Sequence, residues 1–201
     1  MKTVIIDYGS GNLHSALKSF QKVANLSKKG NVKVTSDPKQ IKYADKLVLP
    51  GVGSFNDCLK GLKANNDLYY NLTERVLKDG VPFLGICVGF QLLADYGHEN
   101  VVNTPGLGWL GGEVKKICRK NKDIKIPHMG WNSLIFDREH PLTKKLTPED
   151  DMYFVHSYHL LLKNPSNRLA YVNYSGEITA CLLYTSPSPR DAHESRMPSS
   201  A

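Results

Sequence analysis

The stretch Gly85-Ile86-Cys87-Val88-Gly89 places a cysteine between two glycines, each two residues away. An apolar run at 81–84 precedes it and a helix-like run at 90–94 follows, so the cysteine falls where a strand turns into a helix. Such a nucleophile elbow needs small residues at both glycine positions, because the sharp turn brings them together. A helix N-terminus also favours the thiolate, which attacks carbonyl carbon. We therefore predict that Cys87 is a catalytic nucleophile rather than a structural cysteine.

A second turn, Pro50-Gly51-Val52-Gly53, follows the apolar segment 46–49. In enzymes with a nucleophile elbow, two backbone N–H groups bind the oxyanion. One belongs to the residue after the nucleophile and the other to a turn after a neighbouring strand, and each stabilises the transition state by about 3 kcal/mol. Alone, the two glycines would indicate only a tight turn. Together with the elbow they favour acyl transfer through a thioester, and the predicted oxyanion donors are Val52, Gly53 and Val88.

Short apolar runs alternate with helical spacing in the first half of the chain. The expected strands are 2–7, 31–35, 46–49 and 81–84, and Ser54 is the expected N-cap of a helix in which Cys58 fills the core. This alternation predicts an α/β fold with a mostly parallel sheet and helices on both faces. The turns 8–12 and 50–53 and Cys87 all follow strands, so we expect them at one sheet edge.

After residue 107 the β-like runs become shorter, at 114–117, 133–136 and 152–155. They predict additional short antiparallel strands. Neither a repeat nor a linker interrupts residues 1–180, so we expect one domain there. Residues 181–201 are rich in Ser and Pro and lack apolar periodicity, which predicts a disordered tail. One back-translation of 181–191 reproduces a transposon-type sequencing adapter, so we interpret this tail as a sequencing artefact.

Composition excludes several classes of function. The net charge is +7, but the lysines are scattered in twos and threes among acidic residues, which indicates a solvated surface rather than a nucleic-acid site. The four cysteines are far apart in the sequence, so we expect reduced thiols in a cytoplasmic protein with neither disulfides nor a zinc site. The sequence has no uninterrupted run of 18 apolar residues, so we expect no membrane span. His156 and His159 have the spacing of a metal pair, but a third ligand is missing nearby, and we predict no metal.

Five motifs carry a family resemblance: D-Y-G-S-G-N-L at 7–13, L-P-G-V-G-S-F at 49–55, G-I-C-V-G-F-Q-L-L at 85–93, P-H-M-G-W-N at 127–132 and Y-F-V-H-S-Y-H at 153–159. In this order they resemble the glutaminase subunits of imidazole glycerol phosphate synthases, a family of class I, triad-type glutamine amidotransferases. The resemblance covers residues 1 to about 180. It implies a flavodoxin-like, class I amidotransferase fold and no cofactor.

The resemblance also implies an activity. Cys87 would attack the side-chain amide of glutamine, giving a γ-glutamyl thioester, ammonia and glutamate. Glutamine would contact Gln91, Glu99 and the backbone of His156, Ser157 and Tyr158. The ammonia would pass to a (β/α)8-barrel cyclase in a heterodimer that makes imidazole glycerol phosphate and aminoimidazole carboxamide ribotide in histidine biosynthesis. The implied partner interface consists of Tyr8, Gly9, Ser10, Gly11, Asn12, Met129, Trp131, Asn132 and Tyr153.

One feature of the family is missing from these 201 residues. The family completes its triad with a His-Pro-Glu motif near the C-terminus, and this sequence contains none. His140-Pro141-Leu142 precedes the fifth motif, and His193-Glu194 lies in the anomalous tail without the proline. Three hypotheses therefore stay open: a glutaminase subunit whose recorded sequence lost these residues, a silent binding subunit, and a related amidotransferase that feeds ammonia to another acceptor.

Overall fold

The computed structural model describes residues 1–99, 103–147 and 149–183. These residues form two compact units. The first comprises Met1–Leu92 and the second begins at Leu93. Each unit has its own sheets and its own buried side chains.

The first unit contains a four-stranded, all-parallel sheet with the strand order β2-β1-β3-β4. Its strands are β1 (Lys2–Ile6), β2 (Asn31–Thr35), β3 (Lys46–Gly51) and β4 (Phe83–Cys87). All four expected strands are present, although β4 begins two residues later than expected and ends on the elbow cysteine itself. The register pairs Gly51 with Cys87, so the second turn and the elbow start side by side.

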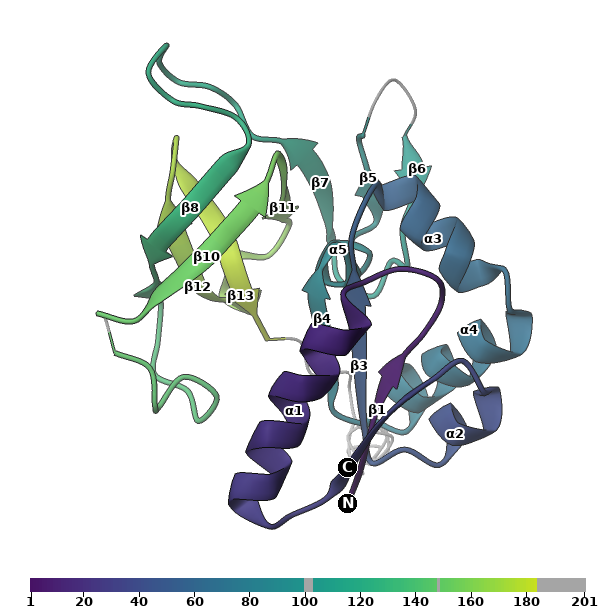
Figure 1. The fold of residues 1–201 in the computed structure, drawn as a ribbon. Helices are drawn as coiled ribbons and strands as arrows, with labels where there is room; N and C mark the ends of the chain where they lie inside the picture. The colour runs from purple at the N-terminus through teal and green to yellow at the C-terminus, as the bar shows by residue number, and fades with distance from the viewer. Residues whose placement is uncertain (100–102, 148, 184–201) are drawn as a thin grey trace, which may run out of the picture. The chain divides into compact units, whose positions relative to one another are not determined.

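The helices of this unit lie on both faces of the sheet (Figure 1). They are α1 (Leu13–Ser27), α2 (Pro38–Lys42), α3 (Phe55–Lys63), α4 (Asn66–Thr73), a π-helix (Glu74–Lys78) and the one-turn α5 (Val88–Gln91). The chain moves from β1 outward to β2 and then back across β1 to β3 and β4. Right-handed crossovers therefore put α1 on one face and α2 to α4 on the other.

The core of the first unit follows the sequence pattern. The central strands β1 and β3 are buried along most of their length, as expected for parallel strands covered on both faces. Phe55, Leu59 and Leu62 of α3 are buried, and so is Cys58. The side chain of Ser54 accepts a hydrogen bond from the N–H of Asp57, which confirms the predicted N-cap.

The second unit is built from short, mostly antiparallel strands. Strand β8 pairs with β10, β12 lies between β13 and β9, and β7 lies between β11 and the small β5–β6 pair. A 3₁₀ turn, Pro165–Asn167, precedes β12. The strand bounds are β5 Tyr96–Gly97, β6 Thr104–Pro105, β7 Gly112–Lys116, β8 His128–Ser133, β9 Ile135–Phe136, β10 Asp151–His156, β11 Tyr158–Leu162, β12 Arg168–Asn173 and β13 Glu177–Leu182.

Strand β13 crosses the boundary that the composition suggested at residue 180. Its last two residues, Cys181 and Leu182, pair with β12, at Ala170 and Arg168 respectively. The N–H of Leu183 also donates to the carbonyl of Asn167. Ordered structure therefore extends at least three residues past the predicted boundary, and the rest of the predicted tail, His193-Glu194 included, lies outside the described residues.

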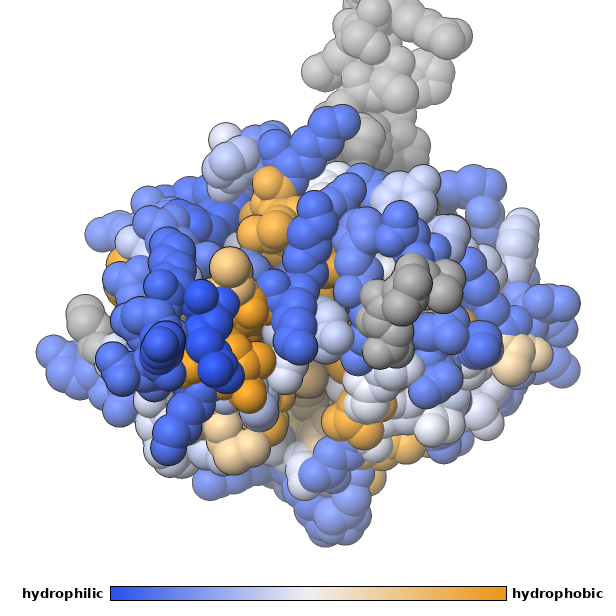
Figure 2. Space-filling model, turned by 90° about the horizontal axis from the view of Figure 1, so that it is seen from above, coloured by the Kyte–Doolittle hydropathy of each residue, from blue (hydrophilic) through white to orange (hydrophobic). Residues whose placement is uncertain are grey.

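Hydrophilic side chains cover most of the face shown in Figure 2, and hydrophobic ones form separate clusters between them. In the described part of the chain, every helix is too short or too polar to cross a lipid bilayer.

Strand β4 is an edge strand among the described residues, and one of its faces is open. Leu84 is 49% exposed and Ile86 is 36% exposed, whereas Leu49 on neighbouring β3 is fully buried. An open apolar strand at a sheet edge is a site for association with another chain.

We expect Leu84→Ala to lower the free energy of unfolding by about 1 kcal/mol or less, because little buried area is lost. The matched change Leu49→Ala should cost about 2–5 kcal/mol, because it leaves a cavity in the core. Urea unfolding monitored by circular dichroism gives both values. Equal losses for the two variants would show that the open face of β4 is covered in solution.

Candidate active site

The elbow around Cys87 has the backbone that the sequence predicted. Cys87 has φ 56° and ψ −116°, a conformation that L-residues rarely adopt and that is typical of strained catalytic turns. A Cβ on Gly85 would lie 2.7 Å from the carbonyl oxygen of Gly89, and a Cβ on Gly89 would lie 1.9 Å from that of Leu49. Only glycine fits at either position. Gly85 is crowded by Gly89, as the sequence predicted, whereas Gly89 is crowded by strand β3.

The second turn lies directly against the elbow. A Cβ on Gly51 would lie 2.7 Å from the backbone nitrogen of Gly89 and 2.7 Å from the hydroxyl oxygen of Tyr8. The Tyr8 hydroxyl donates to the carbonyl of Pro50 at 2.7 Å. The turn at residues 8–12, the turn at 50–53 and the elbow therefore meet at the carboxyl ends of β1, β3 and β4, as predicted.

Ser10 holds the second turn through both backbone groups of Val52. Its hydroxyl oxygen accepts from the Val52 N–H at 3.0 Å and donates to the Val52 carbonyl at 2.8 Å. The thiol of Cys58 donates to the same carbonyl at 3.3 Å. The Val52 N–H, a predicted oxyanion donor, is therefore already used in this arrangement, and the sequence alone did not indicate this role for Ser10.

The segment 8–12 contributes less free surface than predicted. Tyr8 is 8% exposed, and burial raises its pKa, with a smaller contribution from Cys58. Asn12 caps α1 by accepting from the N–H of Ser15. Gly9 and Asn12 are exposed, whereas Tyr8 and Ser10 are occupied with the second turn. The side chains of Tyr8 and Ser10 thus make hydrogen bonds that hold the second turn in place.

The thiol of Cys87 is less acidic than its position predicted. The residue is exposed, but the protein atoms around its sulfur desolvate it, and this desolvation raises the thiol pKa above its usual value. A hydrogen bond from the Val88 N–H lowers the pKa by a smaller amount. The helix α5 has only one turn, so the aligned peptide dipoles behind this hydrogen bond are few. At neutral pH the group is a thiol that needs a base.

The predicted glutamine contacts are divided between the two units. Gln91, four residues after Cys87, ends the single turn of α5 in the first unit and is half-buried. Glu99 lies in the second unit and is also half-buried. In the same unit, His156 ends β10, Tyr158 begins β11, and Ser157 forms the tight turn between them. The Ser157 carbonyl accepts from the N–H of Ile117 at 2.8 Å, which fixes this turn on the end of β7.

Strands β8 and β10 present an apolar face. Met129 is 61% exposed and Trp131 is 71% exposed, and their register partners Val155 and Tyr153 are 55% and 54% exposed. The Trp131 and Tyr153 rings pack edge to face with centroids 5.5 Å apart. Asn132, predicted to lie beside Trp131, occupies the other face of β8. Its amide nitrogen there lies 3.5 Å from Nε2 of His128 and 3.4 Å from the Asn173 carbonyl.

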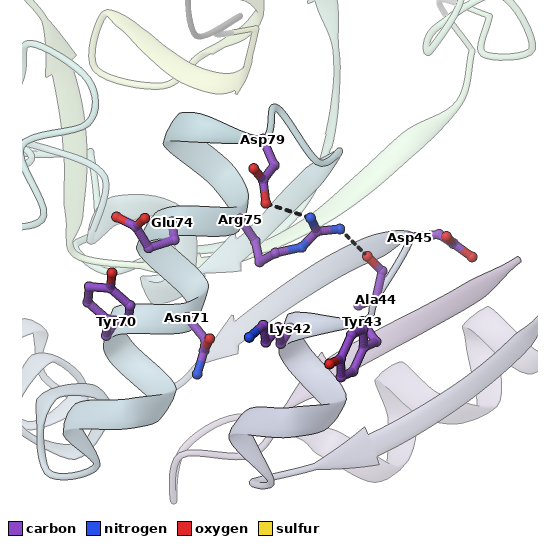
Figure 3. Close-up of a pocket in the computed structure, with 9 residues that line it drawn as sticks. All are labelled: Lys42, Tyr43, Ala44, Asp45, Tyr70, Asn71, Glu74, Arg75 and Asp79. Carbon is purple, nitrogen blue, oxygen red and sulfur yellow. Dashed lines mark hydrogen bonds and ion pairs between the residues drawn. The ribbon is translucent and has the colours of Figure 1, made fainter. Parts of the chain in front are cut away.

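An open cavity of about 580 Å³ lies far from the elbow within the first unit. Figure 3 shows its lining, in which Arg75 bonds Asp79 and the carbonyl of Ala44. Ala44 precedes β3 and Asp79 precedes β4, so the cavity is at the amino ends of strands whose carboxyl ends carry the site. In open parallel sheets ligands bind at the carboxyl ends. We therefore assign the cavity no role in the chemistry of Cys87.

The raised pKa of Cys87 gives a testable pH dependence. A raised pKa leaves a smaller thiolate fraction at neutral pH, so iodoacetamide should alkylate folded Cys87 several-fold more slowly than the same residue in urea. The pH midpoint of alkylation should be higher in the folded chain than in the unfolded one. Mass spectrometry of the peptide that contains Cys87 measures both rates. A lower midpoint in the folded chain would show that the helix N-terminus dominates.

Comparisons with known proteins agree with this geometry. The model of the family "Glutamine amidotransferase class-I" matches residues 4–181. The imidazole glycerol phosphate synthase subunit HisH of Ruegeria pomeroyi is 51% identical over 180 residues, covering 90% of this chain and 84% of that protein. HisH of Bradyrhizobium diazoefficiens is 52% identical over 184 residues, covering 90% of this chain and 85% of that protein.

Solved structures support the fold. A glutamine amidotransferase of Thermotoga maritima has a TM-score of 0.62 at 16% identity, covering 92% of this chain and 72% of that one. Another glutamine amidotransferase of known structure has a TM-score of 0.61 at 15% identity, covering 84% of this chain and 79% of that one. By its family match and by the identity and coverage of its relatives, the chain belongs to the class-I glutamine amidotransferases and, within them, to the family of the imidazole glycerol phosphate synthase subunit HisH.

Proposed function

We propose that this protein is the glutaminase subunit of an imidazole glycerol phosphate synthase and supplies ammonia for histidine biosynthesis. The observation that carries the proposal is the elbow, with Cys87 at φ 56° between two glycines that admit no Cβ. The family match and the relatives named HisH support the choice of this synthase over other acceptors of ammonia. Four free cysteines fit a cytoplasmic location.

In the proposed reaction the sulfur of Cys87 attacks the side-chain carbonyl carbon of glutamine. The Val88 N–H, which bonds the sulfur in this structure, is a proposed donor to the developing oxyanion. Collapse of the tetrahedral intermediate releases ammonia and leaves a γ-glutamyl thioester, which water hydrolyses to glutamate. We keep Gln91, Glu99, His156, Ser157 and Tyr158 as proposed glutamine contacts and Val52 and Gly53 as further proposed oxyanion donors.

This chemistry needs a base, because the pKa of the Cys87 thiol is raised. The base must take the thiol proton and return one to the leaving ammonia. The family supplies it from a His-Pro-Glu motif that these 201 residues do not contain. This favours a second candidate for the chain as written, a subunit that binds its partner without hydrolysing glutamine.

We expect the 201-residue chain to hydrolyse glutamine at least about 10²- to 10⁴-fold more slowly than a chain in which a strand ending in Gln-Phe-His-Pro-Glu follows Ala180. Glutamate release, measured with and without the cyclase, tests this. The matched controls are the extended chain with alanine for the added histidine and the extended chain with Cys87→Ala. Equal rates for the written and extended chains would contradict the need for the added base. An inactive extended chain that still binds the cyclase would favour the silent subunit.

We also propose a heterodimer with a (β/α)8-barrel cyclase that uses the apolar face of β8 and β10. Its four side chains, Met129, Trp131, Tyr153 and Val155, alternate with inward-facing residues, so one flat patch is formed. Exposed apolar patches of this kind mark interaction sites. Asn132 and the turn at residues 8–12, with Tyr8 and Ser10 included, stay proposed contacts. In that turn the missing Cβ of Gly11 allows a close approach to Pro50.

Trp131 should dominate this interface, because large aromatic anchors carry most of the binding energy of such patches. We expect Trp131→Ala to raise the Kd for the cyclase from the same genome by about 30-fold, equivalent to about 2 kcal/mol. Leu142→Ala is the control, because Leu142 is 68% exposed but lies outside strands β8 and β10. Isothermal titration calorimetry measures both. An unchanged Kd for Trp131→Ala would place the interface elsewhere.

A further inference from the structure

Two imidazole rings meet inside the second unit and extend into a line of hydrogen-bonding groups. Nδ1 of His128 lies 3.2 Å from Nε2 of His156, its register partner on β10. Nδ1 of His156 lies 2.9 Å from the carbonyl oxygen of Tyr158. At the other end, Nε2 of His128 lies 3.5 Å from the amide nitrogen of Asn132, which also donates to the carbonyl of Asn173.

The two ends of this line determine where every proton sits. A carbonyl oxygen only accepts, so Nδ1 of His156 must carry its proton. In a neutral ring Nε2 is then an acceptor, and Nδ1 of His128 must donate to it. Nε2 of His128 in turn accepts from the Asn132 amide. The partners therefore assign the Nδ1–H tautomer to both rings, and all the bonds run in one direction.

The surroundings keep His128 uncharged. The residue is 3% exposed, and its ring stacks on Tyr174 at 3.8 Å and on Phe154 at 4.9 Å between centroids. Desolvation lowers the pKa of His128 to about 4, with a further contribution from His156. Burial also lowers the pKa of His156 and of His159, which lies on β11. Among the contacts described here, His156 and Tyr174 are the titratable groups that face His128, and neither is a carboxylate.

We infer that His128 is a positioning residue: its Nδ1–H donates to Nε2 of His156, opposes a proton there, and so reinforces the Nδ1–H bond that holds the Tyr158 carbonyl beside the Ser157 turn. Its link to glutamine rests on the proposed function, in which the backbone of residues 156–158 holds the amino-acid end of the substrate. A proton added to Nε2 of His156 would oppose the His128 donor. Every hydrogen bond in the line would then have to reverse its direction. Nε2 of His128 would become a donor that faces the amide nitrogen of Asn132, which is also a donor.

A purely structural role would require only that the space between the strands be filled. Leucine at position 128 fills much of that space but offers no donor to His156. Asparagine is smaller, yet its amide nitrogen comes near the position of the imidazole Nδ1. The positioning role therefore predicts that asparagine preserves the state of His156 and leucine does not, whereas packing alone predicts the opposite order.

The first measurement uses the complete 201-residue chain labelled with ¹⁵N at histidine, in long-range ¹H–¹⁵N spectra. We expect His128 and His156 as neutral Nδ1–H tautomers at pH 7.5. A His128 pKa near 4, well below the usual 6.5, means that the unfolded chain binds the extra proton first. Its contribution to stability is therefore complete above about pH 6.5 and is lost as pH falls toward 4. The control His14→Gln changes an exposed histidine and should leave both signals unaltered.

The second measurement compares His128→Asn with His128→Leu. We expect the Asn variant to keep His156 as the Nδ1–H tautomer and the Leu variant to populate the Nε2–H tautomer beside it, with glutamine binding by calorimetry weakened about tenfold only in the Leu variant. An Nε2–H tautomer of His156 in the unchanged chain overturns the inference, even if a variant fails to fold. Equal effects of Asn and Leu overturn it as well. If the tautomers are as stated but the unchanged chain does not bind glutamine, the proposed substrate contact is wrong while the positioning of Tyr158 by His128 stands.

Discussion

The first unit depends on the close approach of two backbones at the elbow. The α-carbon of Gly89 sits so near the carbonyl of Leu49 that a methyl group there would overlap it at 1.9 Å. This approach ties the start of α5 to β3, although α5 follows β4 in the sequence. It also forces the turn to be sharp, and a sharp turn leaves Cys87 at positive φ. This strained turn fits because no side chain is present where the backbones come closest, at Gly51, Gly85 and Gly89.

The same packing that aims Cys87 also limits its reactivity. A long helix beginning at Val88 would favour the thiolate, but α5 ends after one turn and the sulfur is partly desolvated by its neighbours. The raised thiol pKa has a chemical consequence, because the nucleophile stays protonated until a base is provided. Attack on a carbonyl carbon therefore needs a nearby group that takes the thiol proton. The geometry of the elbow and the protonation of its sulfur are separate conditions for reactivity.

Much of the first unit could be predicted because its signals are local. The alternation of apolar runs with turns predicted four parallel strands, and the two glycines around Cys87 predicted the elbow. The division into two units was not predicted, because the polypeptide passes between them at Leu92–Leu93 without any change in composition. The use of the Val52 N–H by Ser10 was also missed, since the two residues are 42 positions apart. Contacts of that range depend on strand order, which periodicity does not reveal.

In strand β8, neighbouring residues of one sequence motif lie on opposite faces of the strand and have different roles. Met129 and Trp131 point to the exposed face, while His128 and Asn132 point into the unit. The motif P-H-M-G-W-N predicted a single surface because the family resemblance gives motif positions but not strand faces. Alternation alone would have separated them, since residues i and i+2 share a face and i+1 does not. A one-residue slip against β10 would bring Trp131 inside and expose the histidine line, so the apolar face and the hydrogen-bonded line depend on the same register.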